Sequence, residues 1–211
     1  MEDENETIKI LLLGNYDVGK TGLIKRYLEN TFDEENNNIA SGSKFSRKVI
    51  NKNGKEYELQ IWDTAGQEKF HAVSKHFYKD AYIICLVYDI TNQESLDSLK
   101  LIWYPDVKKY GEKYVILAVV GNQCHLYDYD YLADENKAKE FAQSIGAIFK
   151  LTSPKTGEGV EELFDTLVNK FLSSEFQSKY LEMKKSKGDI KVLKPNEGGN
   201  KKKKKGPCKN F

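Results

Sequence analysis

The stretch Gly14-Asn15-Tyr16-Asp17-Val18-Gly19-Lys20-Thr21 decides how this chain folds. A mostly apolar run, residues 8–13, precedes it, and a helical pattern, residues 23–28, follows it. A strand, a loop of the form G-x-x-x-x-G-K-[ST] and a helix together make a phosphate-binding loop. The glycines let backbone N–H groups turn inward at the positive end of the helix, where they attract an anion. We therefore predict a bound nucleotide; the alternative is a glycine-rich turn without a ligand.

Two side chains of this loop and one beyond it have predicted roles. Lys20 is placed to reach the outer phosphates, and the Thr21 hydroxyl is placed to bind Mg²⁺. The Asp63 carboxylate, at the end of a later strand, is placed to hold the same ion through water. The predicted nucleotide contacts of the loop are Asn15, Asp17, Val18, Gly19, Lys20, Thr21 and Gly22.

The composition indicates one domain with a basic tail. The chain has 211 residues, of which 39% are apolar and 31% are charged, and this is enough for a single core. The net charge of +1 hides an asymmetry, because residues 184–211 carry eleven lysines against two acidic residues, which leaves −8 on the rest. The acidic body argues against a nucleic-acid partner, and the basic tail favours an anionic surface.

The cysteines and the N-terminus favour a cytoplasmic protein. Cys85, Cys124 and Cys208 are dispersed and odd in number, which argues against disulfides and a zinc site. The N-terminus is acidic, shows no signal sequence and lacks the glycine that myristoylation needs. Apolar runs such as residues 82–88 are too short to cross a bilayer.

The order of strands and helices predicts an α/β fold. Continuous apolar runs at 8–13, 82–88 and 114–120 are typical of buried parallel strands, and residues 147–151 add a short one. Asn53-Gly54 joins β-rich runs at 44–50 and 55–62, which indicates a hairpin. Helices are expected at 20–29, 95–110, 134–145 and 160–171. We predict a six-stranded, mostly parallel sheet with one antiparallel hairpin, flanked by about five helices.

Several motifs follow the predicted strands. They are LQIWDTAGQEKF at 59–70, FYKDA at 77–81, YDITNQES at 88–95 and TGEGVEELF at 156–164. In the first, the Gly66 N–H can meet a terminal phosphate and Gln67 can orient an attacking water. With these motifs, residues 7–172 resemble the Ras superfamily of small GTPases, most closely the Rab family, although residues 103–107 are more reminiscent of Rho proteins.

The resemblance implies a P-loop small G domain that switches between GTP and GDP with Mg²⁺ in vesicle traffic. It also implies an exchange factor, a GTPase-activating protein, a GDP-dissociation inhibitor and effectors as partners. We expect an N-terminal extension at residues 1–7, the G domain at 8–175 and a hypervariable basic tail at 176–211. The catalytic residue would be Gln67, and Phe32 resembles the aromatic residue that packs on the base.

The first departure from the family pattern lies in switch I, where the family has a threonine that binds Mg²⁺ and the γ-phosphate. Aligning the chain on Phe32 puts Ile39 at this position, and aligning it on a later phenylalanine puts Ala40 there; neither has a hydroxyl. The two nucleotide states should then differ less. The residues that could substitute, if the asparagine-rich insertion lets the loop shift, are Ser41 and Ser43.

The second departure lies in guanine recognition, where the family's Asn-Lys-x-Asp reads Asn122-Gln123-Cys124-His125. The family's aspartate accepts two guanine N–H groups, whereas a neutral histidine offers one acceptor and a protonated one offers none. The resulting unpaired donor costs roughly 1–3 kcal/mol or more.

A second loop, Ser153-Pro154-Lys155, stands at the family's Ser-Ala-Lys. Lys155 can still flank the base, but Pro154 has no N–H to donate to the guanine oxygen. We therefore expect weakened guanine selectivity. In the phosphate loop, Tyr16 and Asp17 stand where small residues are usual and should slow hydrolysis or weaken binding; the alternative is that each turns outward.

The C-terminus, Cys208-Lys209-Asn210-Phe211, has the C-a-a-X form that a prenyltransferase recognises, although its middle residues are not aliphatic. We expect prenylation of Cys208, with five lysines at 201–205 as the second membrane signal; a chance cysteine is the alternative. This places the protein on the cytoplasmic face of a membrane.

Two functions therefore remain open. The first is a Rab-like GTPase with slow hydrolysis, and the second is a pseudo-GTPase that binds partners with little nucleotide cycling. An ATPase or kinase of the same loop family is disfavoured by the whole pattern.

Overall fold

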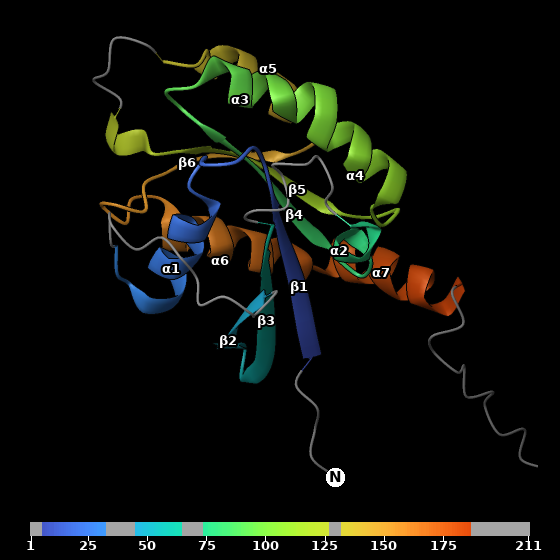
Figure 1. Cartoon of the computed structure of the whole chain (residues 1–211). Coiled ribbons are helices and arrows are strands. Elements are labelled where there is room, and N and C mark those ends of the chain that lie inside the picture. Colours follow the sequence, from blue (N-terminus) through green and yellow to red (C-terminus); the bar gives the residue numbers. More distant parts are fainter. Residues whose placement is uncertain (1–5, 33–44, 65–73, 127–131, 187–211) are drawn as a thin grey trace, which may run out of the picture.

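The structure is a computed structural model that describes residues 6–32, 45–64, 74–126 and 132–186. A six-stranded sheet runs through it in the order β2-β3-β1-β4-β5-β6 (Figure 1). The strands are β1 (Glu6–Leu13), β2 (Phe45–Lys52), β3 (Lys55–Asp63), β4 (Ile83–Asp89), β5 (Ile116–Asn122) and β6 (Ile148–Thr152). Only β2 runs antiparallel to its neighbour. The predicted mostly parallel sheet with one hairpin is therefore confirmed.

Helices cover both faces of the sheet (Figure 1). On one face lie α1 (Lys20–Glu29), α6 (Val160–Phe171) and α7 (Ser174–Ser186); on the other lie α2 (Lys75–Tyr78), α3 (Gln93–Ser98), α4 (Tyr104–Tyr110) and α5 (Glu135–Ser144). Side chains alternate along β1, so Ile10 belongs to the core under α1 and α6, and Leu11 to the core under α3 and α5. This two-sided burial explains the nearly continuous apolar strands of the sequence.

The hairpin between β2 and β3 turns where the sequence predicted it. Asn53 and Gly54 both have positive φ, 56° and 77°, as a two-residue turn of the primed type requires. Nothing lies within 4 Å of a Cβ added to Gly54. Glycine is therefore needed here for the backbone conformation and not to avoid a steric clash.

The helix predicted at residues 95–110 contains a π turn. The segment η2 (Leu99–Trp103) joins α3 to α4, and the N–H of Tyr104 donates to the carbonyl of Leu99, five residues back. Pro105 follows directly and has no N–H to donate to the carbonyl four residues before it. The widened turn thus lies where the regular α-helical ladder is interrupted.

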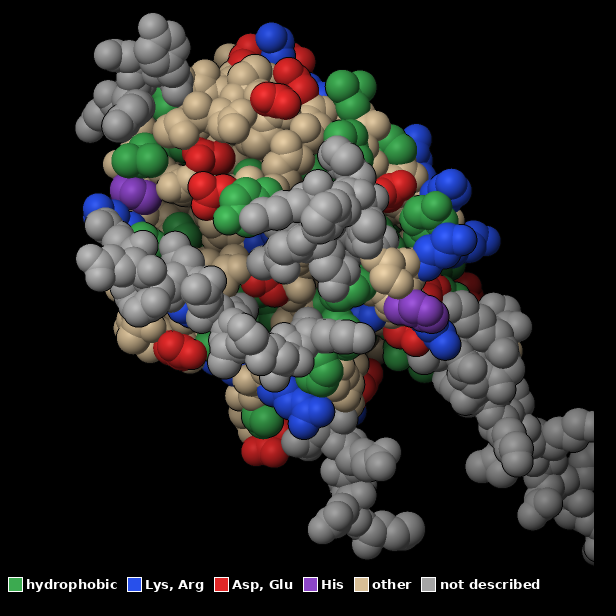
Figure 2. All heavy atoms as spheres, in the orientation of Figure 1, with side chains coloured by type: hydrophobic (Ala, Val, Ile, Leu, Met, Phe, Trp, Pro, Cys, Tyr) green, Lys and Arg blue, Asp and Glu red, His purple; other side chains and the backbone are tan. Residues whose placement is uncertain are grey.

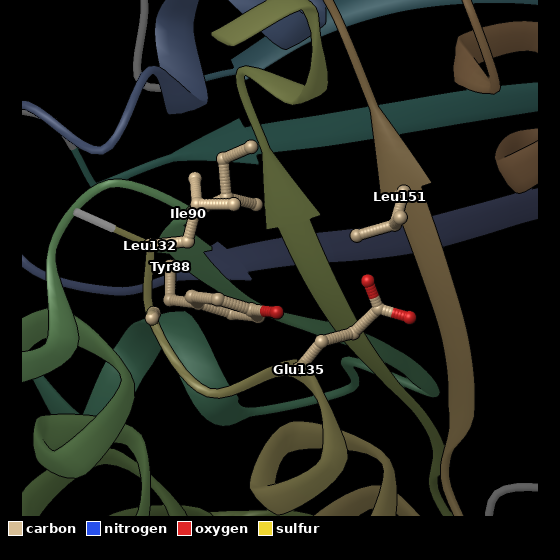
Figure 3. Close-up of a pocket in the computed structure, with 6 residues that line it drawn as sticks. Tyr88, Ile90, Leu132, Glu135 and Leu151 are labelled. Carbon is tan, nitrogen blue, oxygen red and sulfur yellow. The ribbon is translucent and has the colours of Figure 1, made fainter. Parts of the chain in front are cut away.

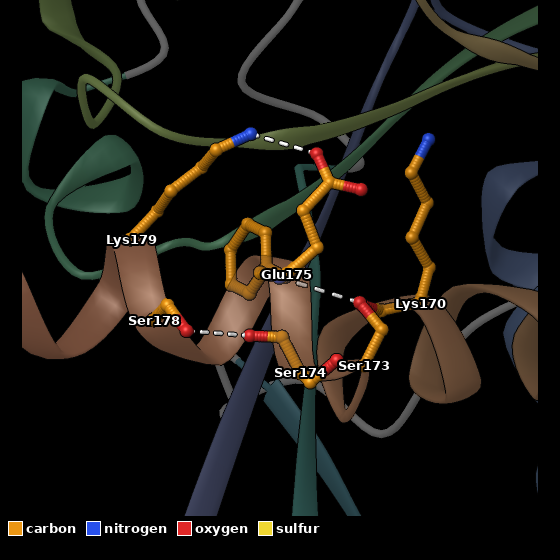
Figure 4. Close-up of polar contacts among 7 residues, drawn as sticks. Lys170, Ser173, Ser174, Glu175, Ser178 and Lys179 are labelled. Atoms are coloured by element: carbon orange, nitrogen blue, oxygen red, sulfur yellow. Dashed lines mark hydrogen bonds and ion pairs between the residues drawn. The ribbon is translucent and has the colours of Figure 1, made fainter.

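The helix α7 crosses the boundary that we placed at residues 175 and 176. The Ser173 hydroxyl accepts a hydrogen bond from the Phe176 N–H at 3.3 Å, and Lys179 pairs with Glu175 at 2.8 Å (Figure 4). Its apolar side packs on the core, where Met183 is 6% exposed. The sequence analysis assigned no element here and placed residues 176–211 in a basic tail, although only three of the thirteen residues of α7 are lysine.

The molecular surface carries both signs of charge. Lysine side chains gather over the end of α4, whose last turn carries Lys108 and Lys109 (Figure 2).

Among the described residues, no helix combines the length and the apolar character needed to cross a membrane.

Candidate functional site

The phosphate loop leaves the carboxyl end of β1, which lies between β3 and β4. The strand order reverses at this point, and ligands of open α/β sheets bind in the crevice that such a reversal creates. Gly14 has φ 152°, and a Cβ there would lie 2.1 Å from the Val87 carbonyl oxygen. At Gly19, with φ 82°, a Cβ would lie 2.4 Å from the Asn122 side-chain nitrogen. A side chain at either position would clash with these atoms, so both positions of the motif require glycine.

Lys20 lies in this loop with its charged end enclosed. Only 3% of the residue is exposed. Its Nζ donates to the carbonyl oxygens of Gly14 at 3.1 Å and Asn15 at 2.7 Å. An ammonium held between backbone carbonyls at the start of a helix fits an anionic ligand, because the helix end and the lysine charge both attract phosphate oxygens.

Thr21 and Asp63 meet across the crevice. The Thr21 hydroxyl donates to the Asp63 carboxylate at 2.5 Å, although 42 residues separate them. A hydroxyl and a carboxylate beside a phosphate site are the oxygen ligands that Mg²⁺ uses together with substrate phosphates. The pair therefore fits the predicted ion. The next residue, Thr64, is buried and donates to the Leu12 carbonyl at 3.1 Å, which joins the end of β3 to β1.

Asn122 ties the predicted base-binding loop to the phosphate loop. It is fully buried; its Nδ2 donates to the Val18 carbonyl at 2.9 Å, and its Oδ1 accepts from the Thr152 hydroxyl at 2.9 Å. The ends of β5 and β6 are thus fixed to the loop after β1. The loop after β1 and the ends of β5 and β6, which are distant in the sequence, thus meet at the carboxyl-terminal end of the strands.

The two altered residues of the base loop have polar partners. Gln123, at φ 68°, donates from Nε2 to the Asp89 carboxylate at 2.5 Å. The Nδ1 of His125 lies 3.0 Å from the Ser153 hydroxyl, which also accepts from the Thr156 N–H at 3.1 Å. With Nδ1 engaged, the imidazole presents at most one acceptor to a base, where a carboxylate would present two.

Arg26 holds the second base loop and was missed by the sequence analysis. Its guanidinium donates to the carbonyls of Pro154 at 2.5 Å and Lys155 at 2.7 Å, and to that of Asn30 at 2.8 Å. The sequence gives no sign of this contact, since the partners lie about 130 residues apart and are backbone atoms.

Two bulky residues of the phosphate loop face outward. Tyr16 is 56% exposed, and Asp17 is exposed with φ 65°, a left-handed conformation that aspartate tolerates better than most residues. Both side chains thus lie as the outward alternative expected. Phe32, proposed to pack on the base, is partly buried at the last described position before residue 33.

Several predicted site residues lie outside the described part of the chain. They are the switch I candidates Ile39, Ala40, Ser41 and Ser43, the switch II residues Gly66 and Gln67, and the predicted lipidation site Cys208.

Three described residues near the two switch segments form an aromatic row. The ring of Trp62 stacks on Phe45 at 4.7 Å and meets Phe77 edge-on at 5.6 Å, between centroids. These contacts join the start of β2, the end of β3 and the helix α2.

A cavity of about 210 Å³ lies beside the base loop on the α5 side. It is lined by Tyr88, Ile90, Leu132, Ala133, Glu135 and Leu151 (Figure 3). Burial, and to a lesser degree the Glu135 charge, raise the pKa of Tyr88, so its hydroxyl stays neutral. None of the lining residues is a predicted nucleotide contact, and this cavity is distinct from the crevice at the phosphate loop.

The fold and the loop together define a P-loop nucleotide-binding domain of the small G-domain type. The model of the Ras family matches residues 9–173, and the chain therefore belongs to this family. Similar proteins include RabG2 of Dictyostelium discoideum, 38% identical over 164 residues, which are 78% of this chain and 82% of the relative. Mouse Rab-31 is 38% identical (74% and 79% covered), and Rab-21 of the sponge Geodia cydonium is 39% identical (79% and 71%). Within the Ras family, the chain is thus a Rab-like protein.

Proposed function

We propose that this protein binds guanine nucleotide with Mg²⁺ and acts as a Rab-like switch in vesicle traffic, with weakened guanine selectivity and slow hydrolysis. The observation that carries the proposal is the enclosed Lys20 beside the Thr21–Asp63 pair. These groups bind phosphate and metal whichever base is attached. When bound, Mg²⁺ would neutralise charge on the phosphate oxygens, and Gln67 would orient the attacking water.

The base-binding loops support the weakened selectivity. His125 offers at most one acceptor beside Ser153, and Pro154 has no N–H for the guanine oxygen. The remaining frame of Asn122, Thr152 and Val18 keeps the loops in place. Binding energy would therefore come mainly from the phosphates.

The nucleotide that freshly purified full-length protein carries tests this proposal. We expect the released nucleotide, separated by chromatography after denaturation, to be GDP or GTP in a substantial fraction of molecules. Lys20→Asn should remove it, because the buried ammonium is lost. Protein that binds neither nucleotide at millimolar concentration would overturn the proposal, and equal affinity for ATP and GTP would overturn guanine selectivity.

The base loop allows a second test. The double change Gln123→Lys and His125→Asp should tighten GTP binding by about tenfold or more, since it restores two acceptors for the base. In this structure the new lysine would face the Asp89 carboxylate, which now accepts from Gln123. Calorimetric titration with GTP and ATP measures the change. Unaltered GTP affinity would contradict the assigned role of this loop.

A pseudo-GTPase is the second candidate function. The altered residues are concentrated at the predicted base site, which favours this function. The phosphate loop would also keep its shape without a nucleotide, because contacts to Val87 and Asn122 hold it. Such a protein would bind effectors without nucleotide cycling. An effector pull-down that is insensitive to Lys20→Asn would favour it over the switch.

The tail and partners complete the proposal. The G domain at 8–175 would carry the switch, and residues 1–7 would be an extension. Residues 176–211, which include most of α7, would end in a prenylated Cys208. An exchange factor, a GTPase-activating protein, a GDP-dissociation inhibitor and effectors would act on it at the cytoplasmic face of an anionic membrane. A Cys208→Ser protein that stays on membranes in fractionated cells would contradict the lipid anchor.

A further inference from the structure

The side chain of Asn15 joins the phosphate loop to the π turn of the α3–η2–α4 helix. Its Nδ2 donates to the Ser98 hydroxyl at 3.0 Å, and its Oδ1 accepts from the Trp103 indole N–H at 2.9 Å. Both ends of the carboxamide are therefore used. Ser98 is 8% exposed and Trp103 is 2% exposed, whereas Asn15 is partly exposed, so these bonds are partly shielded from water. We call these three residues the Asn15 clamp.

The π turn is what allows one carboxamide to contact both partners. Ser98 and Trp103 are five residues apart, and at 3.6 residues per turn such a pair points about 140° apart around an α-helix. The turn Leu99–Trp103 is closed by an i→i+5 hydrogen bond, which takes more residues per turn and brings positions five apart toward one face. The widened turn thus presents the hydroxyl and the indole to the loop together.

Asn15 also contacts Lys20 through its backbone. Its carbonyl oxygen accepts from the Lys20 ammonium at 2.7 Å, while its side chain is held by the helix. The same residue is therefore fixed from two sides. We infer that the Asn15 clamp positions the phosphate loop and Lys20 for phosphate binding, so that Ser98 and Trp103 slow nucleotide release without touching the nucleotide. This inference rests on the proposed nucleotide binding.

Removal of single polar atoms tests the clamp in the full-length protein. Trp103→Phe keeps an aromatic ring in the core and removes the indole N–H, and Ser98→Ala removes the hydroxyl. The matched control is Trp62→Phe, since the Trp62 indole nitrogen is buried and has no hydrogen-bond partner among the described residues. The first measurement is the release rate of a fluorescent GDP analogue. The second is amide hydrogen exchange of residues 14–20 without nucleotide, which needs no bound ligand.

We expect Trp103→Phe and Ser98→Ala each to speed GDP release about fivefold and to raise exchange in residues 14–20. Trp62→Phe should change neither. Equal exchange in Trp103→Phe and Trp62→Phe would overturn the inference whether or not the protein binds nucleotide. Wild-type protein that fails to bind GDP, while exchange responds as expected, would overturn the proposed function and leave the clamp standing. Thermal unfolding of each variant shows that it is folded.

Discussion

Asp17 places a carboxylate in the phosphate loop, in a left-handed conformation with φ 65°. It is exposed, so water and salt screen its repulsion of phosphate oxygens. In its outward position, the side chain should therefore weaken phosphate binding only modestly. The tolerance of aspartate for this conformation explains why the loop keeps its shape without glycine at this position.

Asp17→Asn should therefore tighten GDP binding by a few-fold at low salt, because it removes the charge and keeps a residue that accepts positive φ. The gain should vanish at about 0.5 M salt. Titration of a fluorescent GDP analogue at both salt concentrations measures it. Glu29→Gln, an exposed acid at the far end of α1, is the control. A gain that persists in high salt would contradict a charge effect.

The two buried thiols should be unreactive. Burial, with the nearby Glu158 carboxylate, raises the pKa of Cys124 to about 11, and burial raises the pKa of Cys85 to about 12. At pH 8 only about one Cys124 in a thousand is then the thiolate that reacts. We expect iodoacetamide to spare both in folded protein and to modify both in urea, as read by peptide mass spectrometry. Equal labelling of folded and unfolded Cys124 would refute this.

At the scale of elements, the helix α7 is the part of the fold that sequence reasoning left out. It packs Phe176, Tyr180 and Met183 against the core, and the Tyr180 ring meets Tyr82 edge-on at 4.8 Å between centroids. Its first turn is held by Ser173 and by the Glu175–Lys179 pair. The segment is therefore a structural continuation of the domain beyond residue 175.

Met183→Ala should lower the free energy of unfolding by about 2 kcal/mol, because it leaves a cavity under α7. Leu181→Ala, two residues away and 44% exposed, should cost less than about 0.5 kcal/mol. Urea unfolding of both full-length variants gives the comparison. Equal losses would mean that α7 is not docked in solution.

The sequence predicted elements where local signals suffice. Apolar runs placed β1, β4 and β5, the Asn53-Gly54 pair placed the hairpin, and the glycine motif placed the helix α1. It missed contacts that depend on distant partners. The side chain of Asn15 gains its role only when Ser98 and Trp103, 83 and 88 residues away, reach it through an irregular turn. Arg26 likewise acts on backbone carbonyls that no residue type reveals.

At the scale of the whole molecule, charge is divided between body and tail. Residues 184–211 carry a net +9 and the remainder −8. Lysines near an anionic leaflet contribute on the order of 1 kcal/mol each, whereas an acidic body is repelled by the same surface. The protein should therefore approach such a membrane through its tail.

Unmodified full-length protein should bind vesicles that contain phosphatidylserine, and deletion of residues 184–211 should abolish this binding. Sedimentation with vesicles at low and high salt measures it, and neutral phosphatidylcholine vesicles are the control. Because the attraction is electrostatic, binding should fall steeply with salt. Retention of binding after the deletion would assign the membrane contact to the body.

The supports of the phosphate loop belong to the sheet itself. Gly14 packs closely against the Val87 carbonyl of β4, and the Val18 carbonyl accepts a hydrogen bond from Asn122 of β5. Gln123, His125 and Pro154 are not among these supports, so the fold of the phosphate loop does not depend on them. Substitutions at residues 123, 125 and 154 should therefore change the affinity for the base and leave the shape of the phosphate loop unchanged.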